Sequence, residues 1–418
     1  MTGTDQKTGS QAGPLAGIRV LDLSRVLAGP WAAQTLGDLG ADVIKIEKPG
    51  TGDDTRSWGP PFFESRETPG ETMAAYYMSA NRNKRSVAVD MATAEGQQLI
   101  RQLAAECDIV VENFKVDGLK KYGLDYSGLS AVNPAIIYCS ITGFGQTGPY
   151  KDRPGYDLLV QAMGGMMSVT GERDQLPGGG PQKTGIAIAD LFTGLYGVIG
   201  ILAALHHRDK TGEGQHIDMS LLDTQVAVMG NQAYGYLVSG VEPVRMGNAH
   251  NSIVPYQSFA SSDGHLILAI GNDGQFERFC AAVGMNDISE DERFRTNPAR
   301  VRNRETLIPL LEKIMLSRTT DQWVELLEDH TVPGGPINGM KRVFENEQVV
   351  ARELSKTIAR GNGEVLPTVA SPMQFSKTPV GYNRPPPKLG EHTQEVLNEI
   401  LKMDPSEIAR LKAVLGHS

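Results

Sequence analysis

The sequence predicts an α/β protein, with a Rossmann-like parallel sheet in a large domain and a second, smaller α/β domain. Strand-like and helix-like stretches alternate through the first half of the chain, which is typical of a parallel sheet. The chain has 418 residues, more than one ordinary core holds, and this favours two domains. After about residue 225 hairpin signals replace the alternation, which indicates where the second domain begins.

The alternation begins with a strand, a helix and a second strand. The stretches GIRVLDLS (17–24) and ADVIKIEKP (41–49) are typical of strands. Between them PWAAQTLGDLG (30–40) predicts a helix, with Pro30 in its first turn and Gly40 past its end. We therefore expect a βαβ unit at the start of the sheet.

The same pattern continues to about residue 145. The stretches RSVAVDM (85–91), DIVVENF (108–114) and PAIIYCSITGFG (134–145) predict further strands. ATAEGQQLIRQLAAEC (92–107) predicts a helix, because its apolar residues recur at helical spacing. A doubly wound sheet of this kind binds ligands at the carboxyl ends of its strands.

A long apolar segment, Ile186 to Leu205, has about the length of a bilayer span. Asp190 lies inside it, and glycines recur along it at 194, 197 and 200. A membrane span and a buried helix both remain open, and the buried helix fits better because a carboxylate within a bilayer is costly. We expect this helix to run from Asp190 to about His207.

The part after residue 225 has different signals. Ser262-Asp263-Gly264 is typical of a hairpin turn, and the strand after it leads through a glycine turn into a helix. SRTTDQWVELLEDH predicts a helix capped near Thr320 or Asp321. We expect an extended return and terminal helices after residue 344. The predicted domains are a disordered lead-in (1–15), a large domain (16–225 with 345–418) and a small domain (226–344).

The composition limits the function. The formal net charge is −9, and the basic residues are dispersed, which argues against general binding to nucleic acid or to a membrane surface. The three cysteines, Cys107, Cys139 and Cys280, lie in or beside apolar segments without metal-ligand spacing. They are most simply buried thiols in a reducing compartment, which favours the cytoplasm.

No glycine-rich phosphate motif is present at the first strand end. The turn there reads SRVLAGP, not GxGxxG, so a nicotinamide-binding site is not favoured. Cations near the strand ends could instead form a basic rim for a phosphorylated, adenine-bearing ligand. Each of them could also be an ordinary solvated side chain. These cations are Arg25, Lys48, Arg56, Arg82, Lys84, Arg85, Lys120 and Lys121.

The sequence allows two compatible roles for Asp190. Aspartate is a preferred N-cap residue, so Asp190 could simply begin the apolar helix. A carboxylate that the helix terminus holds ionised in an apolar pocket is also a nucleophile. The residues alone favour capping.

Many segments resemble the class III coenzyme A transferases, the formyl-CoA and carnitine-CoA transferase (CaiB/BaiF) family. The resemblance runs from about residue 16 to the C-terminus, in order. The segments that carry it include GIRVLDLSRVLAGPWAAQTLGDLGADVIKIEKPGTGDDTR, NRNKRSVAVDM, VENF, SITGFGQTGPY, RPGYD, GIAIADLFTGLYG and LGEHTQEVL.

The resemblance implies transfer of coenzyme A from an acyl-CoA donor to a free carboxylate, with coenzyme A as substrate and no tightly bound metal or redox cofactor. It places the family's nucleophile on Asp190, through an anhydride and an aspartyl-CoA thioester. It also implies a homodimer of two interlocked chains. The partners it implies are acyl-CoA and carboxylic acids.

The family's CoA contacts map onto seven residues of this chain: Arg25, Lys48, Val89, Asn113, Phe114, Lys121 and Tyr122. Near the acyl group the chain departs from the family, because a family glutamine falls on Leu27 and a family lysine on Thr142. These departures put formate or oxalate specificity in doubt.

The stretch GNAHNSIVPYQSF resembles transferases that handle dicarboxylates such as succinate or glutarate. His250 and Gln275 are therefore candidate acyl-pocket residues, and the candidate substrate residues also include Leu27, Thr142 and Tyr156. The family's active-site glycine loop would fall on GNDGQF (271–276), which could be a closing lid or a plain turn capped by Asn272 or Asp273.

Two other functions remain open. α-Methylacyl-CoA racemases resemble the chain over the same span, but they carry a histidine where this chain has Tyr156, and tyrosine is a poor base near neutrality. A noncatalytic acyl-CoA-binding protein is the other alternative. Asp190 and the basic rim argue against it.

Overall fold

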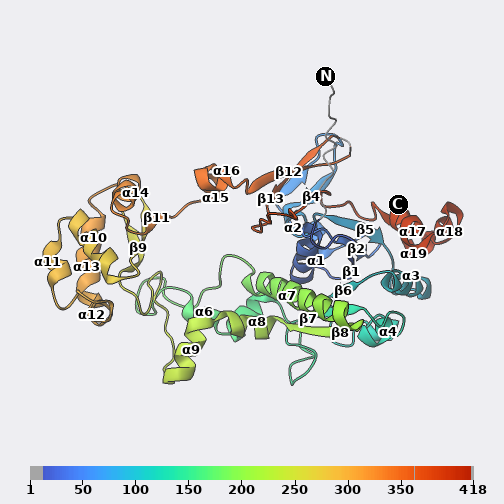
Figure 1. The fold of residues 1–418 in the computed structure, drawn as a ribbon, viewed down its shortest axis with the longest axis horizontal. Coiled ribbons are helices and arrows are strands. Elements are labelled where there is room, and N and C mark those ends of the chain that lie inside the picture. Colours follow the sequence, from blue (N-terminus) through green and yellow to red (C-terminus); the bar gives the residue numbers. More distant parts are fainter. Residues whose placement is uncertain (1–12, 362, 416–418) are drawn as a thin grey trace. The chain divides into compact units, whose positions relative to one another are not determined.

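The computed structural model describes residues 13–361 and 363–415, which divide into two compact units (Figure 1). The first contains the chain up to Gly165, Gly185–Ala233 and the segment from Gln348 onward, and the second contains Met166–Thr184 and Tyr234–Glu347. The division predicted at 226–344 lies close to the longer segment of the second unit. Residues 166–184, expected in the large domain, belong to the second unit instead.

A six-stranded parallel sheet, in the order β5-β2-β1-β6-β7-β8, forms the centre of the first unit. Its strands are β1 (Arg19–Asp22), β2 (Asp42–Glu47), β5 (Lys84–Ala88), β6 (Ile109–Glu112), β7 (Ile137–Thr142) and β8 (Gln215–Ser220). The predicted α/β fold with a parallel sheet is confirmed. The edge strand β8 is absent from the prediction, because its alternating residues are largely polar and exposed.

Helices cover both faces of this sheet. They are α1 (Ala28–Asp38), α3 (Ala94–Ala105), α4 (Tyr126–Ser130), α7 (Ile188–Thr211), α17 (Thr393–Leu401), α18 (Pro405–Arg410) and α19 (Lys412–Leu415). Successive side chains of a strand point to opposite faces, so Val20 packs in the core with α1 and α7, whereas Leu21 packs in the core with α3 and α17. Figure 1 shows α1 and α7 lying together beside the sheet.

Shorter elements complete the first unit. They are η1 (Asp54–Ser57), β3 (Phe62–Glu64), β4 (Thr72–Ala74), α2 (Ala75–Ser79), η2 (Lys120–Tyr122), α5 (Asp157–Met163), α8 (Leu221–Val228), β12 (Ser355–Ala359) and β13 (Val365–Val369). The strands β3 and β4 pair antiparallel, as do β12 and β13. The predicted extended return therefore contains a short hairpin before the terminal helices.

The second unit holds a three-stranded sheet of β9 (Tyr256–Ala260), β10 (His265–Ala269) and β11 (Gly334–Pro336). Its helices are α6 (Met166–Val169), α10 (Asp273–Ala282), α11 (Asn286–Glu290), α12 (Asn297–Arg302), α13 (Arg304–Met315), α14 (Thr320–Asp329) and α15 (Met340–Glu345). α9 (Gly230–Ser239) and α16 (Glu347–Ala351) cross the unit boundaries. The hairpin predicted at residues 262–264 is confirmed by the antiparallel pairing of β9 with β10.

One of the two predicted helix starts agrees with the structure, and the other differs. The N-cap of α14 is Thr319, one residue before the two candidates, and it forms a capping box with Gln322. α7 begins at Ile188, so Asp190 lies in its first turn and is not its N-cap. The helix also runs past His207, to a left-handed Gly212 with φ of 79°.

α7 is the one helix of the described residues that is long and apolar enough to cross a membrane, and 44% of its apolar window is buried. It packs against α1, α5, α8, β7 and the edge strand β8. One face of α7 is therefore buried in this unit, as the buried-helix interpretation predicts. The opposite face exposes Phe192, Leu195, Tyr196, Ile199 and Leu202.

The three cysteines are free and buried, as predicted. Residues 1–12 of the predicted lead-in lie outside the described residues. Residues 13–15 are packed against the fold, because Leu15 donates its N–H to the Leu39 carbonyl at 2.9 Å and its side chain contacts the core.

Candidate active site

Four adjacent strands end at the same edge of the sheet, because all of them run parallel. The residues that directly follow these strands include five of the predicted CoA contacts. Lys48 follows β2, Val89 follows β5, Arg25 lies just after β1, and Asn113 and Phe114 follow β6. The fold thus brings these five residues to one edge.

The Asn113 side-chain amide makes two hydrogen bonds with the backbone of Arg25. The Asn113 Oδ1 accepts the Arg25 N–H at 2.9 Å, and the Asn113 Nδ2 donates to the Arg25 carbonyl at 2.6 Å. The Arg25 guanidinium lies 6.0 Å from the centre of the Phe114 ring and pairs with Asp54 at 2.8 Å. More than half of the Arg25 side chain is exposed (56%), so it can still reach a ligand.

The residue between Arg25 and the start of α1 has an uncommon backbone. Val26 has φ of 72°, a left-handed conformation that is strained for a β-branched residue. Its N–H donates to Asp53 Oδ1 at 3.2 Å, and Lys45 pairs with the other Asp53 oxygen at 2.9 Å. Burial of these charges fixes the loop that carries Arg25.

The other two predicted CoA contacts lie in η2, after β6. The Lys121 ammonium lies 4.6 Å from the centre of the Tyr122 ring. Tyr122 and Phe114 both pack against the core that contains Val89. The two rings therefore rest on the same hydrophobic core.

Four of the eight cations predicted to form a basic rim do not do so. Arg56, Arg82, Lys84 and Arg85 are held in ion pairs, with Glu47, Asp38, Asp22 and Asp42 respectively. Lys84 is fully buried, and burial lowers the pKa of its ammonium to about 8. These four cations stabilise the sheet and its loops. The exposed cations that remain near this edge are Arg25, Lys48, Lys120 and Lys121.

Asp190 is the third residue of α7, and its side chain caps no backbone group there. The cap comes from Asp157, at the start of α5. The Asp157 Oδ1 accepts the N–H groups of Ala189 at 2.8 Å and of Asp190 at 3.3 Å. The predicted capping role of Asp190 is therefore wrong, because residue 157 performs it.

The charge state of Asp190 also differs from the expectation. Burial, and secondarily the negative charge of Asp157, raise the pKa of the Asp190 carboxyl from 3.8 to about 7. No cation among the described residues opposes this shift. The helix terminus was expected to keep Asp190 ionised, but its environment instead favours the neutral acid below pH 7.

Tyr76 of α2 lies within the electrostatic reach of the same carboxylate. Burial, followed by the charge of Asp190, raises the pKa of the Tyr76 phenol. Sequence reasoning did not find Tyr76 or Asp157. The stretch RPGYD, which contains Asp157, is notable in the sequence only for its resemblance to the family. Nothing in the stretch AAYYMS indicates a functional role for Tyr76.

A third missed group is Glu112, the last residue of β6. Burial raises the pKa of its carboxyl to about 7, although Ser140 and the N–H of Phe114 donate to it. Its position directly before Asn113 fixes the turn that bears two predicted CoA contacts. A buried acid inside VENF is visible in the sequence only as a polar residue in an apolar strand.

The predicted acyl-group residues of the first unit differ in exposure. Leu27 and Thr142 are buried, and the Thr142 Oγ1 accepts the Gly145 N–H at 3.0 Å. Tyr156 is 70% exposed and directly precedes Asp157. Of the three, only Tyr156 offers most of its side chain to a ligand in this unit.

His250 and Gln275 both lie in the second unit. The His250 Nδ1 accepts the Ser252 N–H at 3.1 Å, and the Gln275 Oε1 accepts the Gly271 N–H at 2.7 Å. Asn272 is the N-cap of α10, which is one of the two readings left open for residues 271–276. Their roles in an acyl pocket stay predictions.

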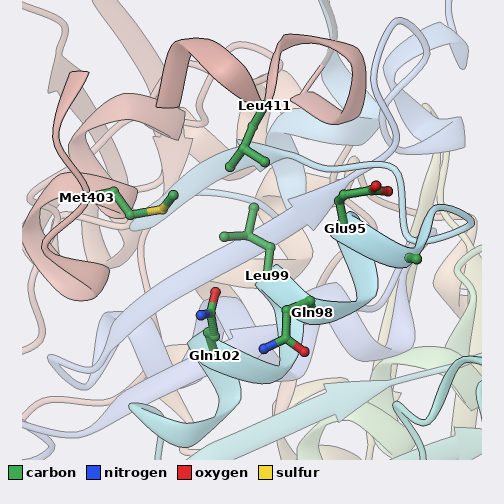
Figure 2. Close-up of a pocket in the computed structure, with 7 residues that line it drawn as sticks. Glu95, Gln98, Leu99, Gln102, Met403 and Leu411 are labelled. Atoms are coloured by element: carbon green, nitrogen blue, oxygen red, sulfur yellow. The ribbon is translucent and has the colours of Figure 1, made fainter. Parts of the chain in front are cut away.

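The first unit also contains a cavity (Figure 2). It has a volume of about 360 Å³ between α3 and the C-terminal helices. Its lining residues are Ala94, Glu95, Gln98, Leu99, Gln102, Met403 and Leu411. None of these is a predicted site residue. No group of His, Cys, Asp and Glu suited to a metal ion occurs among the described residues.

Known proteins resemble this chain over nearly its whole length. A succinate–glutarate CoA-transferase of Agrobacterium fabrum is 53% identical, over 93% of this chain and 96% of its own length. The human succinyl-CoA:glutarate CoA-transferase is 42% identical, over 98% of this chain and 91% of its own. The crystal structure of a CaiB/BaiF family protein from Brucella suis superposes with a TM-score of 0.83, at 50% identity, and covers 93% of this chain and 100% of that one.

The sequence model of CoA-transferase family III matches residues 15–393. A match of this extent, together with full-length relatives above 30% identity, shows the family, so this chain belongs to CoA-transferase family III and is a class III CoA-transferase.

Proposed function

We propose that the enzyme moves coenzyme A from a dicarboxyl-CoA donor such as succinyl-CoA to a second dicarboxylate, with Asp190 as nucleophile. The observation that carries this proposal is the Asp190 carboxylate in the first turn of α7. It is desolvated, and no cation among the described residues stabilises it. A carboxylate with few stabilising partners is more reactive than one held in an ion pair.

The reaction balances without an external reagent. An Asp190 oxygen attacks the thioester carbonyl, and the CoA thiolate leaves as an anhydride forms. The thiolate then attacks the Asp190 carbonyl carbon and expels the donor's carboxylate, which leaves an aspartyl-CoA thioester. The acceptor carboxylate attacks this thioester to give a second anhydride, and the thiolate attacks the acceptor's acyl carbon. The products are a new acyl-CoA and the free Asp190 carboxylate.

The packing of α1 on α7 supports a route for CoA to this carboxylate. Gly194, one turn after Asp190, lies so close to α1 that a Cβ there would come 2.6 Å from the Ala28 carbonyl. The loop that carries Arg25 leads directly into this end of α1. CoA with its adenine near Phe114 and Tyr122 would therefore extend its thiol along the start of α1 toward α7.

The dicarboxylate specificity is supported by the relatives, two of which are named for succinate or succinyl-CoA and glutarate. The residues that we assign to the acyl groups are Leu27, Thr142, Tyr156, His250 and Gln275. The seven mapped residues at the strand ends and η2 are assigned to CoA.

We also propose a homodimer in the cytoplasm. Its support is the exposed apolar surface on two helices of the first unit: Leu158 and Leu159 of α5, and the outer face of α7. An isolated monomer would leave this surface in water. The buried free thiols suit a reducing compartment.

The test of the function uses the full-length protein with succinyl-CoA and a panel of acids: glutarate, oxalate and formate. Mass spectrometry of the nucleotide pool should show glutaryl-CoA forming with loss of succinyl-CoA. Exchange with oxalate or formate alone would contradict the dicarboxylate assignment. Deuterium incorporation at the α-carbon of an α-methylacyl-CoA, without any exchange, would favour the racemase instead.

A further inference from the structure

A second carboxylate, that of Asp157 at the start of α5, caps the first turn of α7 beside Asp190. Its Oδ1 accepts the N–H groups of Ala189 and Asp190, and its Oδ2 accepts the Gln161 side-chain amide at 2.6 Å. Gln161 is fully buried and also donates to the Ile186 carbonyl at 3.4 Å. Asp157 and Gln161 together tie α5 to the segment that leads into α7.

The backbone fixes where Asp157 lies. Two segments cross at Gly143 and Gly155, so closely that a Cβ on Gly155 would lie 2.3 Å from the Gly143 Cα. Gly143 directly follows β7, and Gly155 lies two residues before Asp157. The crossing therefore fixes the first residue of α5 near the carboxyl end of the sheet. Asp157 in turn fixes the first turn of α7 through its hydrogen bonds.

The surroundings of Asp190 leave Asp157 as its principal charged neighbour. Asp157 is the single charged side chain of the described residues whose charge raises the pKa of Asp190. Tyr76 of α2 also interacts electrostatically with this carboxylate. The elements packed against α7 carry further titratable groups: Asp38 of α1, Tyr138 and Cys139 of β7, His216 and Asp218 of β8, and Asp223 of α8. Asp38 pairs with Arg82.

We propose that Asp157 is a positioning residue for Asp190: it fixes the first turn of α7 by two backbone hydrogen bonds and sets a negative charge beside the Asp190 carboxylate. This inference rests on the proposed role of Asp190 as nucleophile. The hydrogen bonds hold the carboxylate in one place for the incoming thioester. The adjacent charge destabilises the resting anion, which is relieved when Asp190 becomes a neutral anhydride or thioester.

Asp157→Asn separates these two effects. The amide oxygen can still accept both N–H groups, but the negative charge is gone. We expect the acid limb of kcat/KM for succinyl-CoA to move down by about one pH unit, because a neighbouring like charge no longer opposes ionisation. Activity at pH 5 relative to pH 8 should then rise about tenfold, and a purely structural role would leave this ratio unchanged.

Two further variants test positioning. Asp157→Ala loses the cap as well as the charge, so we expect kcat to fall by at least about tenfold below that of Asp157→Asn. Gln161→Met keeps both charges but frees the Asp157 Oδ2. We expect a lower kcat, an unchanged KM for succinyl-CoA and an acid limb like that of the native enzyme.

Asp209→Asn is the matched control, because it removes one charge from the exposed end of the same helix, about 28 Å away. Its acid limb should equal the native one. A native acid limb in Asp157→Asn, together with a native kcat in Gln161→Met, would overturn the proposal. Should Asp157→Asn fold poorly, a native kcat in Gln161→Met would overturn it alone. If Asp190→Asn keeps full activity, the proposed nucleophile itself fails, and this result is distinct from the other two.

Discussion

At the scale of single residues, the proposed nucleophile Asp190 is a carboxylic acid that is hard to ionise. Burial and the charge of Asp157 raise the pKa of Asp190 to about 7, about three units above a solvated aspartate. The proposed nucleophile is thus weakly stabilised as an anion. A rise in pH should therefore increase the reaction rate but decrease the free energy of unfolding.

The rate should follow the ionisation of Asp190. Only the anion attacks a thioester, so kcat/KM should rise with pH and level off above about pH 7. Between pH 8 and pH 5 we expect a fall of about 100-fold. Initial rates with succinyl-CoA over this range measure it. A profile that stays flat down to pH 5 would contradict the raised pKa.

The stability should change in the opposite direction. Asp190 ionises near pH 4 in the unfolded chain and near pH 7 in the fold, so ionisation lowers the free energy of unfolding as pH rises through this window, and the full cost is present above pH 7. Asp190→Asn removes that cost. We expect it to raise the free energy of unfolding at pH 8 by about 2 kcal/mol, roughly half of what the full shift implies, because solvent reaches part of the side chain.

Urea unfolding of the native protein and Asp190→Asn at pH 4 and pH 8 measures this difference. The two proteins should be nearly equal at pH 4. A variant that is less stable than the native protein at pH 8 would show that Asp190 holds the fold together and is not a strained acid.

At the scale of elements, the crossing of two chain segments decides where α5 and α7 begin. A side chain at Gly155 would meet the Gly143 backbone, which cannot give way as a flexible side chain would. We expect Gly155→Ala to lower the free energy of unfolding by about 2 kcal/mol or more, and to lower kcat by moving Asp157. Gly361→Ala is its control, since a Cβ there would meet open space, and it should change stability by less than about 0.5 kcal/mol. Equal stability of the two variants would contradict the role of the crossing.

The elements also show where sequence reasoning succeeds and fails. Apolar alternation predicts β1, β2, β5, β6 and β7, because each has a buried face. It does not predict β8, whose polar residues occupy an exposed edge. The predicted start of α7 is misplaced because its cap is Asp157, which lies 31 residues before Ile188 in the sequence and is joined to the helix only by the fold.

The same limit applies to the basic residues. The sequence shows which cations stand near strand ends, but not which of them have a carboxylate within reach. Lys84 and Arg85 are paired and buried, whereas Arg25 remains more than half exposed. The resemblance to a family correctly identified the kind of reaction, because many ordered segments carry it. It could not show what surrounds Asp190.

At the scale of the whole molecule, the apolar outer face of α7 is the main feature that one chain leaves unexplained. Ile199 is 60% exposed on this face. If two copies cover it, Ile199→Glu should place a charge in the interface and weaken the dimer by several kcal/mol. Light scattering after size-exclusion chromatography should give twice the chain mass for the native protein and a large monomer fraction for the variant.

Leu316→Glu is the control for that experiment. Leu316 is also exposed, at 53%, but it lies after α13 in the second unit and is not part of the apolar surface of α5 and α7. This variant should remain dimeric. A native protein that elutes as a monomer at micromolar concentration would contradict the proposed dimer.

The central claim is that Asp190 carries the transferred group. The most direct test quenches the full-length enzyme with hydroxylamine during turnover of succinyl-CoA and glutarate, and then examines the peptide that contains residue 190 by mass spectrometry. We predict a hydroxamate on Asp190 that requires succinyl-CoA and is absent from Asp190→Asn, whose kcat should fall by at least about 1,000-fold. An unmodified Asp190 during active turnover, with full activity in Asp190→Asn, would contradict the account.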